Sequence, residues 1–87
     1  MSTAMTLGPD VGWTSTDDGR VYVAFLPRGP VLVLEDTAAV VWHAALEVPR
    51  EDITAQVASW VGLPVADVEA DVESFVTDLV GRGLLSS

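Results

Sequence analysis

The sequence predicts an α+β fold, a small winged-helix-like domain in which a three-stranded antiparallel sheet is followed by three helices. The first observation behind this prediction is a series of short β-branched and aromatic runs separated by Gly- and Pro-containing turns. The second is a change to helical apolar spacing after Leu34, with Pro and Gly dividing the helical part. A chain of 87 residues, 49% of them hydrophobic, suffices for one domain.

Three strands are expected in the N-terminal half. The first covers Val11–Ser15 and ends at the turn signal of residues 16–19, where Gly accepts a positive φ. The second covers residues 21–26, and a Pro- and Gly-rich connection at 27–30 leads to the third strand, Val31–Leu34. Connections this short favour an antiparallel meander.

The third strand is apolar at every position and therefore on both faces. Antiparallel strands in small proteins usually have one solvated face, so something must help to cover the second one. Its edge carries no Lys, and Pro30 protects only its start. This pattern indicates an open edge suited to β-augmentation by a peptide. The alternatives are that the N-terminal arm or a second copy of the chain covers the edge.

The first two helices have clear limits. Asp36 or Thr37 is expected to N-cap a helix that runs to about residue 46 and is ended by Pro49. A second helix is expected from about residue 50 to the C-cap glycine Gly62. The apolar residues of this second helix that fall on one face are Ile53, Val57, Trp60 and Val61.

The third helix, Val65 to Arg82, has the clearest pattern. Pro64 suits its first turn, Gly83 its C-cap, and residues 84–85 are expected to fold back on the body. Its apolar stripe consists of Val65, Val68, Val72, Phe75, Val76, Leu79 and Val80. The first ten residues have no periodic pattern, so we expect a flexible arm over 1–10 and one domain over 11–87.

Composition narrows the classes of partner. Four Arg, no Lys and 13 acidic residues give a net charge of −9, which repels nucleic-acid phosphates and attracts basic partners. The N-terminus lacks the features of a signal peptide, and no apolar run is long enough to span a membrane. We therefore expect a cytoplasmic protein that binds neither nucleic acid nor membrane.

The residues offer little for catalysis. There is no cysteine, so a thiolate nucleophile and Cys-based metal sites are excluded, and His43, the only histidine, is expected to be a structural or surface residue. The Asp17–Gly19 segment lacks the spaced ligands of a calcium loop, and no phosphate-binding loop is present. We expect no enzymatic activity, no cofactor and no metal.

Acidic residues follow one side of the third helix. Asp67, Asp71, Ser74 and Asp78 are four, three and four positions apart and so share a stripe beside the apolar face. One interpretation is a solvated helix face. The other is an acidic row that meets a basic peptide.

Two segments together carry a resemblance to a known family. Residues 34–42 (LEDTAAVVW) and 71–85 (DVESFVTDLVGRGLL) resemble the PqqD-like family, and the resemblance extends over residues 21–85. It implies a winged-helix-like domain without catalysis that binds the leader of a ribosomally made precursor peptide. The leader would add as an antiparallel strand to the third strand, in the cleft before the third helix.

The resemblance also implies partners. A free-standing domain is similar to the recognition protein of lasso-peptide pathways, whose partners would be a leader peptidase and an ATP-dependent lasso cyclase (a macrolactam synthetase). A PqqD-type peptide chaperone for a radical-SAM enzyme is one alternative. An acidic winged-helix regulator and a plain dimerisation module are the others; for a leader-binding protein we expect a monomer.

The predicted peptide-contacting residues come from one strand and one helix. Those of the strand and its end are Val31, Leu32, Val33, Leu34 and Glu35. Those of the helix are Asp67, Val68, Asp71, Val72 and Phe75. The use of the acidic residues is our inference from charge. The strand face that looks into the cleft stays open, because a shift of one residue exchanges the two faces.

Overall fold

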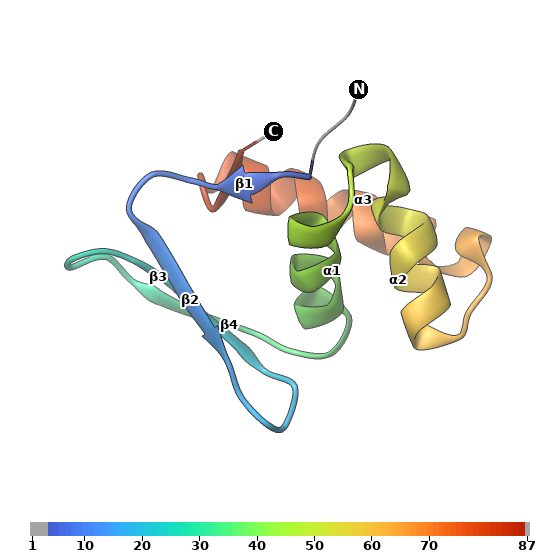
Figure 1. Ribbon diagram of the computed structural model, residues 1–87, viewed down its shortest axis with the longest axis horizontal. Coiled ribbons are helices and arrows are strands. Elements are labelled where there is room, and N and C mark those ends of the chain that lie inside the picture. The colour runs from blue at the N-terminus through green and yellow to red at the C-terminus, as the bar shows by residue number, and fades with distance from the viewer. Residues whose placement is uncertain (1–3, 87) are drawn as a thin grey trace.

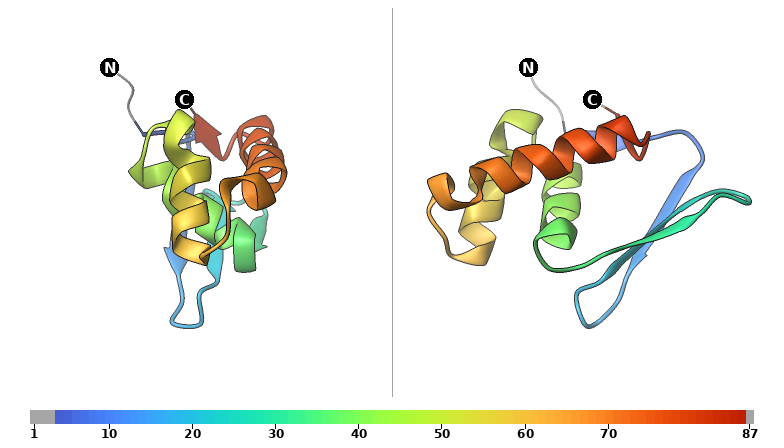
Figure 2. Two further views of the ribbon diagram at one scale, coloured as in Figure 1. Left: turned by 90° about the vertical axis from the view of Figure 1, so that its right-hand side faces the viewer. Right: turned by 180° about the vertical axis from the view of Figure 1, so that it is seen from behind.

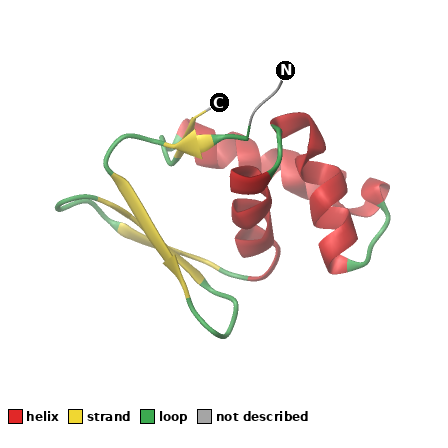
Figure 3. Ribbon diagram, in the orientation of Figure 1, coloured by secondary structure: helices red, strands yellow, loops and turns green. Residues whose placement is uncertain are grey.

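The computed structural model describes residues 4–86 and confirms the predicted fold class (Figure 1). Strands β2 (Val11–Ser15), β3 (Val21–Phe25) and β4 (Val31–Leu34) form an antiparallel sheet in the order β2-β3-β4. The meander follows from the short turns between strands of β-branched and aromatic residues. Figure 3 shows this sheet on one side of the molecule and the helices on the other.

The helical part begins directly after β4. It contains α1 (Asp36–Glu47), a 3₁₀ turn η1 (Arg50–Asp52), α2 (Ile53–Val61) and α3 (Val65–Gly81). Helix α1 stands between the sheet and α2, and α3 crosses behind both of these helices (Figure 1; seen from behind in Figure 2). Within residues 4–86, no helix is both long and apolar enough to cross a membrane.

The core forms where the sheet meets the three helices. Val21 and Val23 of β3 and Trp42 of α1 are fully buried, and the Trp42 ring packs edge-on against Trp13 of β2 with centroids 5.9 Å apart. The expected stripe of α3 supplies Val68, Val72, Val76 and Leu79 as buried residues. Val65, the first residue of α3 and of that stripe, is exposed.

The C-cap of α2 agrees with the sequence, whereas other helix ends differ. Residues 50–52 form η1, so α2 begins only at Ile53, and the C-cap of α3 is Arg82, one residue before the expected Gly83. Gly62 takes the left-handed φ of +73° that the C-cap of α2 requires, and its N–H donates to the Ala58 carbonyl. The predicted N-cap at Asp36 or Thr37 is wrong. Glu35 is the N-cap residue of α1, and its side chain makes no capping hydrogen bond. Asp36 itself has a φ of +52°, whereas a side-chain cap needs extended backbone.

The N-terminal arm differs most from expectation. Residues 1–3 lie outside the described residues, but from residue 4 the arm lies against the body. Strand β1 (Thr6–Leu7) pairs antiparallel with β5 (Leu85–Ser86), and Met5 is buried. The expectation of a flexible arm over 1–10 is therefore corrected for residues 4–10. Pairing with a distant segment leaves no periodic signal in a stretch this short, so the β1–β5 pairing could not be predicted from the sequence.

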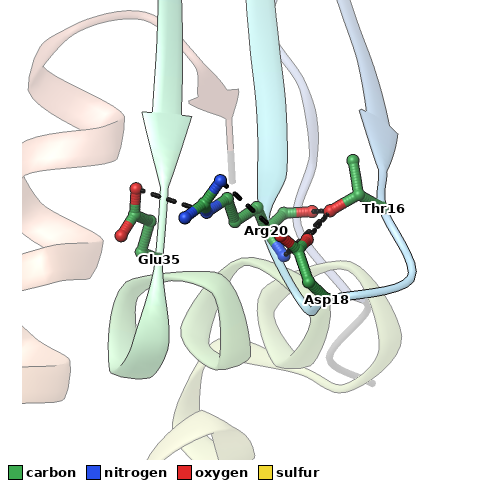
Figure 4. A network of polar contacts seen from close by, with 4 residues as sticks. All are labelled: Thr16, Asp18, Arg20 and Glu35. Carbon is green, nitrogen blue, oxygen red and sulfur yellow. Dashed lines mark hydrogen bonds and ion pairs between the residues drawn. The ribbon is translucent and has the colours of Figure 1, made fainter.

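Polar groups fix the turn between β2 and β3 (Figure 4). The Thr16 hydroxyl donates to the Asp18 carboxylate, which also accepts from the backbone N–H of Arg20 at 3.4 Å. The Arg20 guanidinium lies 3.6 Å from Asp18 and 3.6 Å from Glu35. Arg20 thereby connects this turn to the residue where β4 gives way to α1.

Candidate functional site

One edge of the sheet is open along β4. Within residues 4–86, β4 pairs with β3 and with no other strand, and the N-terminal arm pairs with β5 instead. The Phe25 N–H donates to the Pro30 carbonyl at 3.3 Å. Since hydrogen-bonded and non-hydrogen-bonded pairs alternate along an antiparallel ladder, the backbone groups of Val31 and Val33 point away from β3. These groups form the open edge.

The structure also resolves which face of β4 looks toward the helices. Leu32 and Leu34 lie opposite the buried Val23 and Val21 and pack against the core. Val31 and Val33 point to the outer face of the sheet and are 62% and 47% exposed. The expectation that something covers this second face is therefore wrong for the described residues. The side chains that face the helices are therefore those of Leu32 and Leu34.

A groove runs beside this edge. It has a volume of about 180 Å³ and lies between β4 and the C-terminal part of α3. Figure 2 shows the arrangement of the elements around it: α3 begins near α2 and ends on the side of the molecule where the sheet lies. The residues that line the groove are Leu32, Val33, Leu34, Asp78, Leu79, Arg82 and Leu84. We call this the β4 groove.

The predicted helix residues lie in two different places. Val68 and Val72 are 4% and 1% exposed and belong to the core, so they do not line the β4 groove. Asp67 is exposed in the first turn of α3, at the end away from the groove. Asp71 and Phe75 are closer, because they share a helix face with two residues of the groove.

One side of α3 carries both predicted residues and residues that line the groove. Asp71, Phe75, Asp78 and Arg82 are four, three and four positions apart, which places them on one side of α3. Only the last two line the β4 groove, while Asp71 is exposed and Phe75 is half-buried earlier on the same side. Asp71 and Phe75 thus lie one to two turns before the groove on the side of α3 that leads to it, and their contact with a peptide stays a prediction.

Four lining residues are absent from the predicted set: Asp78, Leu79, Arg82 and Leu84. The helical period extends from Asp71 to Asp78 and Arg82, so the spacing does place these residues on one side of α3. No sequence signal tells which end of α3 approaches β4. That depends on the angle at which α3 crosses α1 and α2.

The charges at the groove are paired. The Arg82 Nε lies 2.8 Å from the Asp78 carboxylate, and both side chains are more than half exposed. Glu35, just past the end of β4, pairs with Arg20. The acidic row proposed from the sequence therefore ends beside a cation, and its acid nearest the groove is partly neutralised.

The β4 groove presents groups that suit the binding of a peptide. It offers backbone donors and acceptors of β4 that no strand within residues 4–86 pairs, leucine side chains and an ion pair at its rim. Its lining contains no histidine, and within residues 4–86 no cluster of three or more His, Cys, Asp or Glu residues could hold a metal ion. Main-chain hydrogen bonds along an edge, with apolar contacts beside it, are the interactions that an extended peptide uses.

Comparisons with known proteins agree with this fold. The family of coenzyme PQQ synthesis protein D (PqqD) matches residues 20–85. A solved structure, TbiB1 in complex with the TbiA(beta) leader peptide, superposes with a TM-score of 0.76 at 23% sequence identity. The match covers 92% of this chain and 93% of that chain. No curated protein matches the sequence.

Proposed function

The chain belongs to the PqqD family, and from that premise we propose that it binds the leader region of a ribosomally synthesised precursor peptide. The leader would add to the free edge of β4 as an antiparallel strand. The observation that carries the proposal is the open edge at Val31 and Val33 directly beside the β4 groove. A structure of similar fold is a complex with a leader peptide, which supports the same function here.

The alternation of side chains along an added strand gives the proposal its geometry. Every second leader residue would point toward the helices and meet Leu32, Leu34 and Leu79. The residues between them would lie beside Val31 and Val33 on the outer face. A strand added at the edge extends the sheet and does not cover that face, so Val31 and Val33 stay largely exposed in the complex.

The test is binding of a fluorescently labelled leader from a candidate precursor, with a scrambled leader as control. Sequence-dependent binding in the micromolar range or tighter, about −8 kcal/mol, supports the proposal. Equal binding of the scrambled peptide contradicts it.

A proline substitution can test the edge itself. Val33→Pro removes one outward N–H and leaves the pairing of β4 with β3 intact, because edge strands tolerate proline at such positions.

The matched control is Ser15→Pro. The Thr16 N–H donates to the Arg20 carbonyl, so the neighbouring Ser15 N–H faces the other free edge of the sheet. We expect Val33→Pro to abolish leader binding and Ser15→Pro to preserve it. Loss in both variants, or in neither, excludes the β4 edge.

The proposal extends to what happens to the bound peptide. We propose that the protein is a non-catalytic, cytoplasmic recognition element that delivers its precursor to a leader peptidase and a lasso cyclase. The resemblance to free-standing recognition proteins of lasso-peptide pathways supports this extension. Purified peptidase and cyclase should process the precursor faster when the protein is added, and the Val33→Pro variant should give no acceleration.

A second candidate function is favoured by the description of the family. The family is described as coenzyme PQQ synthesis protein D, and this description supports a role as a peptide chaperone for a radical-SAM enzyme. The two candidates share the β4 edge and differ in the enzyme that receives the peptide. Acceleration of a radical-SAM enzyme, and not of the peptidase and cyclase, would establish this second function.

A further inference from the structure

A second hollow lies at the opposite edge of the sheet from the β4 groove. It has a volume of about 410 Å³ and is formed by β2, α1 and α2. Its lining is almost entirely apolar and aromatic and consists of Trp13, Val40, His43, Leu46, Glu47 and Trp60. We call it the tryptophan hollow. Because β2 and β4 are separated by β3, the hollow and the β4 groove can be occupied at the same time.

The two tryptophans of the hollow are unusually exposed for core-type residues. Trp13 is 39% exposed and Trp60 is 47% exposed, although the sequence pattern places Trp60 on the buried face of α2. Trp13 is held in place by edge-on contacts, at 5.9 Å to the Trp42 ring and 5.5 Å to the His43 ring. A fixed, exposed indole beside a second one is typical of the energetic centre of a protein interface.

Charge indicates which partner would occupy the hollow. Glu47 is the acidic member of the lining, and no Lys or Arg of the described chain lines it. The segment that leads away, residues 47–52, carries three acids and one Arg, and the whole chain has a net charge of −9. A second copy would bring like charges together. A basic partner would gain both ion pairing and contacts between its cation and the indole rings.

We propose that the tryptophan hollow docks an amphipathic segment of a partner protein in which a Lys or Arg lies between aliphatic side chains. The cation would meet Glu47 and the faces of the indoles, and the aliphatic side chains would cover Val40 and Leu46. The long stem of Lys or Arg suits such a site, since it packs on apolar surface while its head stays near the carboxylate. The proposal stands independently of leader binding, because it uses neither β4 nor its groove.

The test uses a synthetic amphipathic helix of leucine and lysine as the probe, with a leucine–glutamate peptide of the same pattern as its control. A soluble paramagnetic agent broadens the indole N–H signals of exposed tryptophans in the spectrum of the labelled protein. We expect the leucine–lysine probe to protect the signals of Trp13 and Trp60, and the leucine–glutamate peptide to protect neither. Trp42 is fully buried and supplies the internal reference.

Two variants distinguish docking from general attraction to an acidic protein. Glu47→Lys should weaken binding of the probe by about 2- to 5-fold, the size of one exposed cation–π or ion-pair contact. Trp60→Ala should weaken it by about 5-fold or more. Glu73→Lys is the control, since it changes the net charge equally on an exposed position of α3. Equal effects of Glu47→Lys and Glu73→Lys would overturn the proposal.

Two further outcomes would also overturn it. If the Trp13 and Trp60 signals become protected with rising protein concentration alone, a second copy fills the hollow. If a leader peptide protects them, the hollow belongs to leader binding. In a sample whose β4 edge is already occupied by leader, the probe should still protect both signals.

Discussion

The Arg82 guanidinium lies 2.8 Å from the Asp78 carboxylate, one helical turn earlier, at the rim of the β4 groove. This pair is the charged part of a groove whose other lining residues are apolar. An exposed pair of this kind contributes at most a few tenths of a kcal/mol to folding. Its position suggests a larger effect on what the groove binds.

Charge reversal in the groove should affect binding more than charge reversal before it. Asp78→Lys leaves two cations at the rim, and we expect it to weaken a basic leader by about 0.5–2 kcal/mol, the range of one or two exposed ion pairs. Asp71→Lys, two turns earlier on the same side, should have a smaller effect. Titration calorimetry of both variants decides this. An equal loss would indicate that the whole acidic row acts together.

The overall negative charge should make the rate of association with a basic leader depend on the salt concentration. With a net charge of −9, the protein should capture a basic leader more slowly as salt rises, because screening shortens the range of attraction. The dissociation rate should change much less. Stopped-flow measurements over a salt series test this expectation, and an association rate that is independent of salt would contradict it.

Phe75 should contribute less to stability than its aromatic size suggests. It is half-buried on α3, whereas Leu79 is 4% exposed and belongs to the core. We expect Phe75→Ala to cost about 1–3 kcal/mol of the free energy of unfolding, below the range for a fully buried Phe. Leu79→Ala should cost about 2–5 kcal/mol. Denaturant unfolding provides both values; a neutral Phe75→Ala that abolishes leader binding would instead make Phe75 a peptide contact.

The N-terminal arm depends on Gly8. Its N–H donates to the Leu84 carbonyl at 3.0 Å, and a Cβ at this position would lie 1.8 Å from the Gly83 carbonyl oxygen. Gly8→Ala should displace the arm, expose Met5 and destabilise the protein by about 1–3 kcal/mol. Gly81→Ala is the control, because its Cβ would meet nothing within 4 Å and alanine favours the helix. Faster amide exchange of β5 in Gly8→Ala alone would confirm the role of the arm.

The turn between β2 and β3 should respond to acid. The Thr16 hydroxyl, together with Arg20, holds the pKa of Asp18 below its usual value of 3.8. Because the folded-state pKa is lowered, the stabilisation is present above that value and is lost as the pH falls through the lowered pKa. In a carboxyl NMR titration, Thr16→Val should raise the pKa of Asp18. An unchanged pKa would assign the effect to Arg20.

Much of this fold can be predicted from local sequence patterns. β4 was predicted with its observed limits because four consecutive apolar residues follow a Pro-Gly turn, and α2 ends at Gly62 because only glycine takes that φ cheaply. The β1–β5 pairing was not readable, since two-residue strands carry no period. The exposure of Trp60 could not be predicted either, because its position along α2 falls on the same helical face as the buried residues.

The sequence by itself determined the order of the three sheet strands and the three α-helices, the apolar composition of β4, the acidic balance and the family. These depend on residue type and on spacing between neighbours in the chain. Only the tertiary structure decided that Leu32 and Leu34 face the helices, that Asp78 and Arg82 line the β4 groove, and that Trp13 and Trp60 share a hollow. Those facts depend on the angle at which α3 and the sheet meet α1. That angle is set by packing among many residues at once, so no single segment of the chain encodes it.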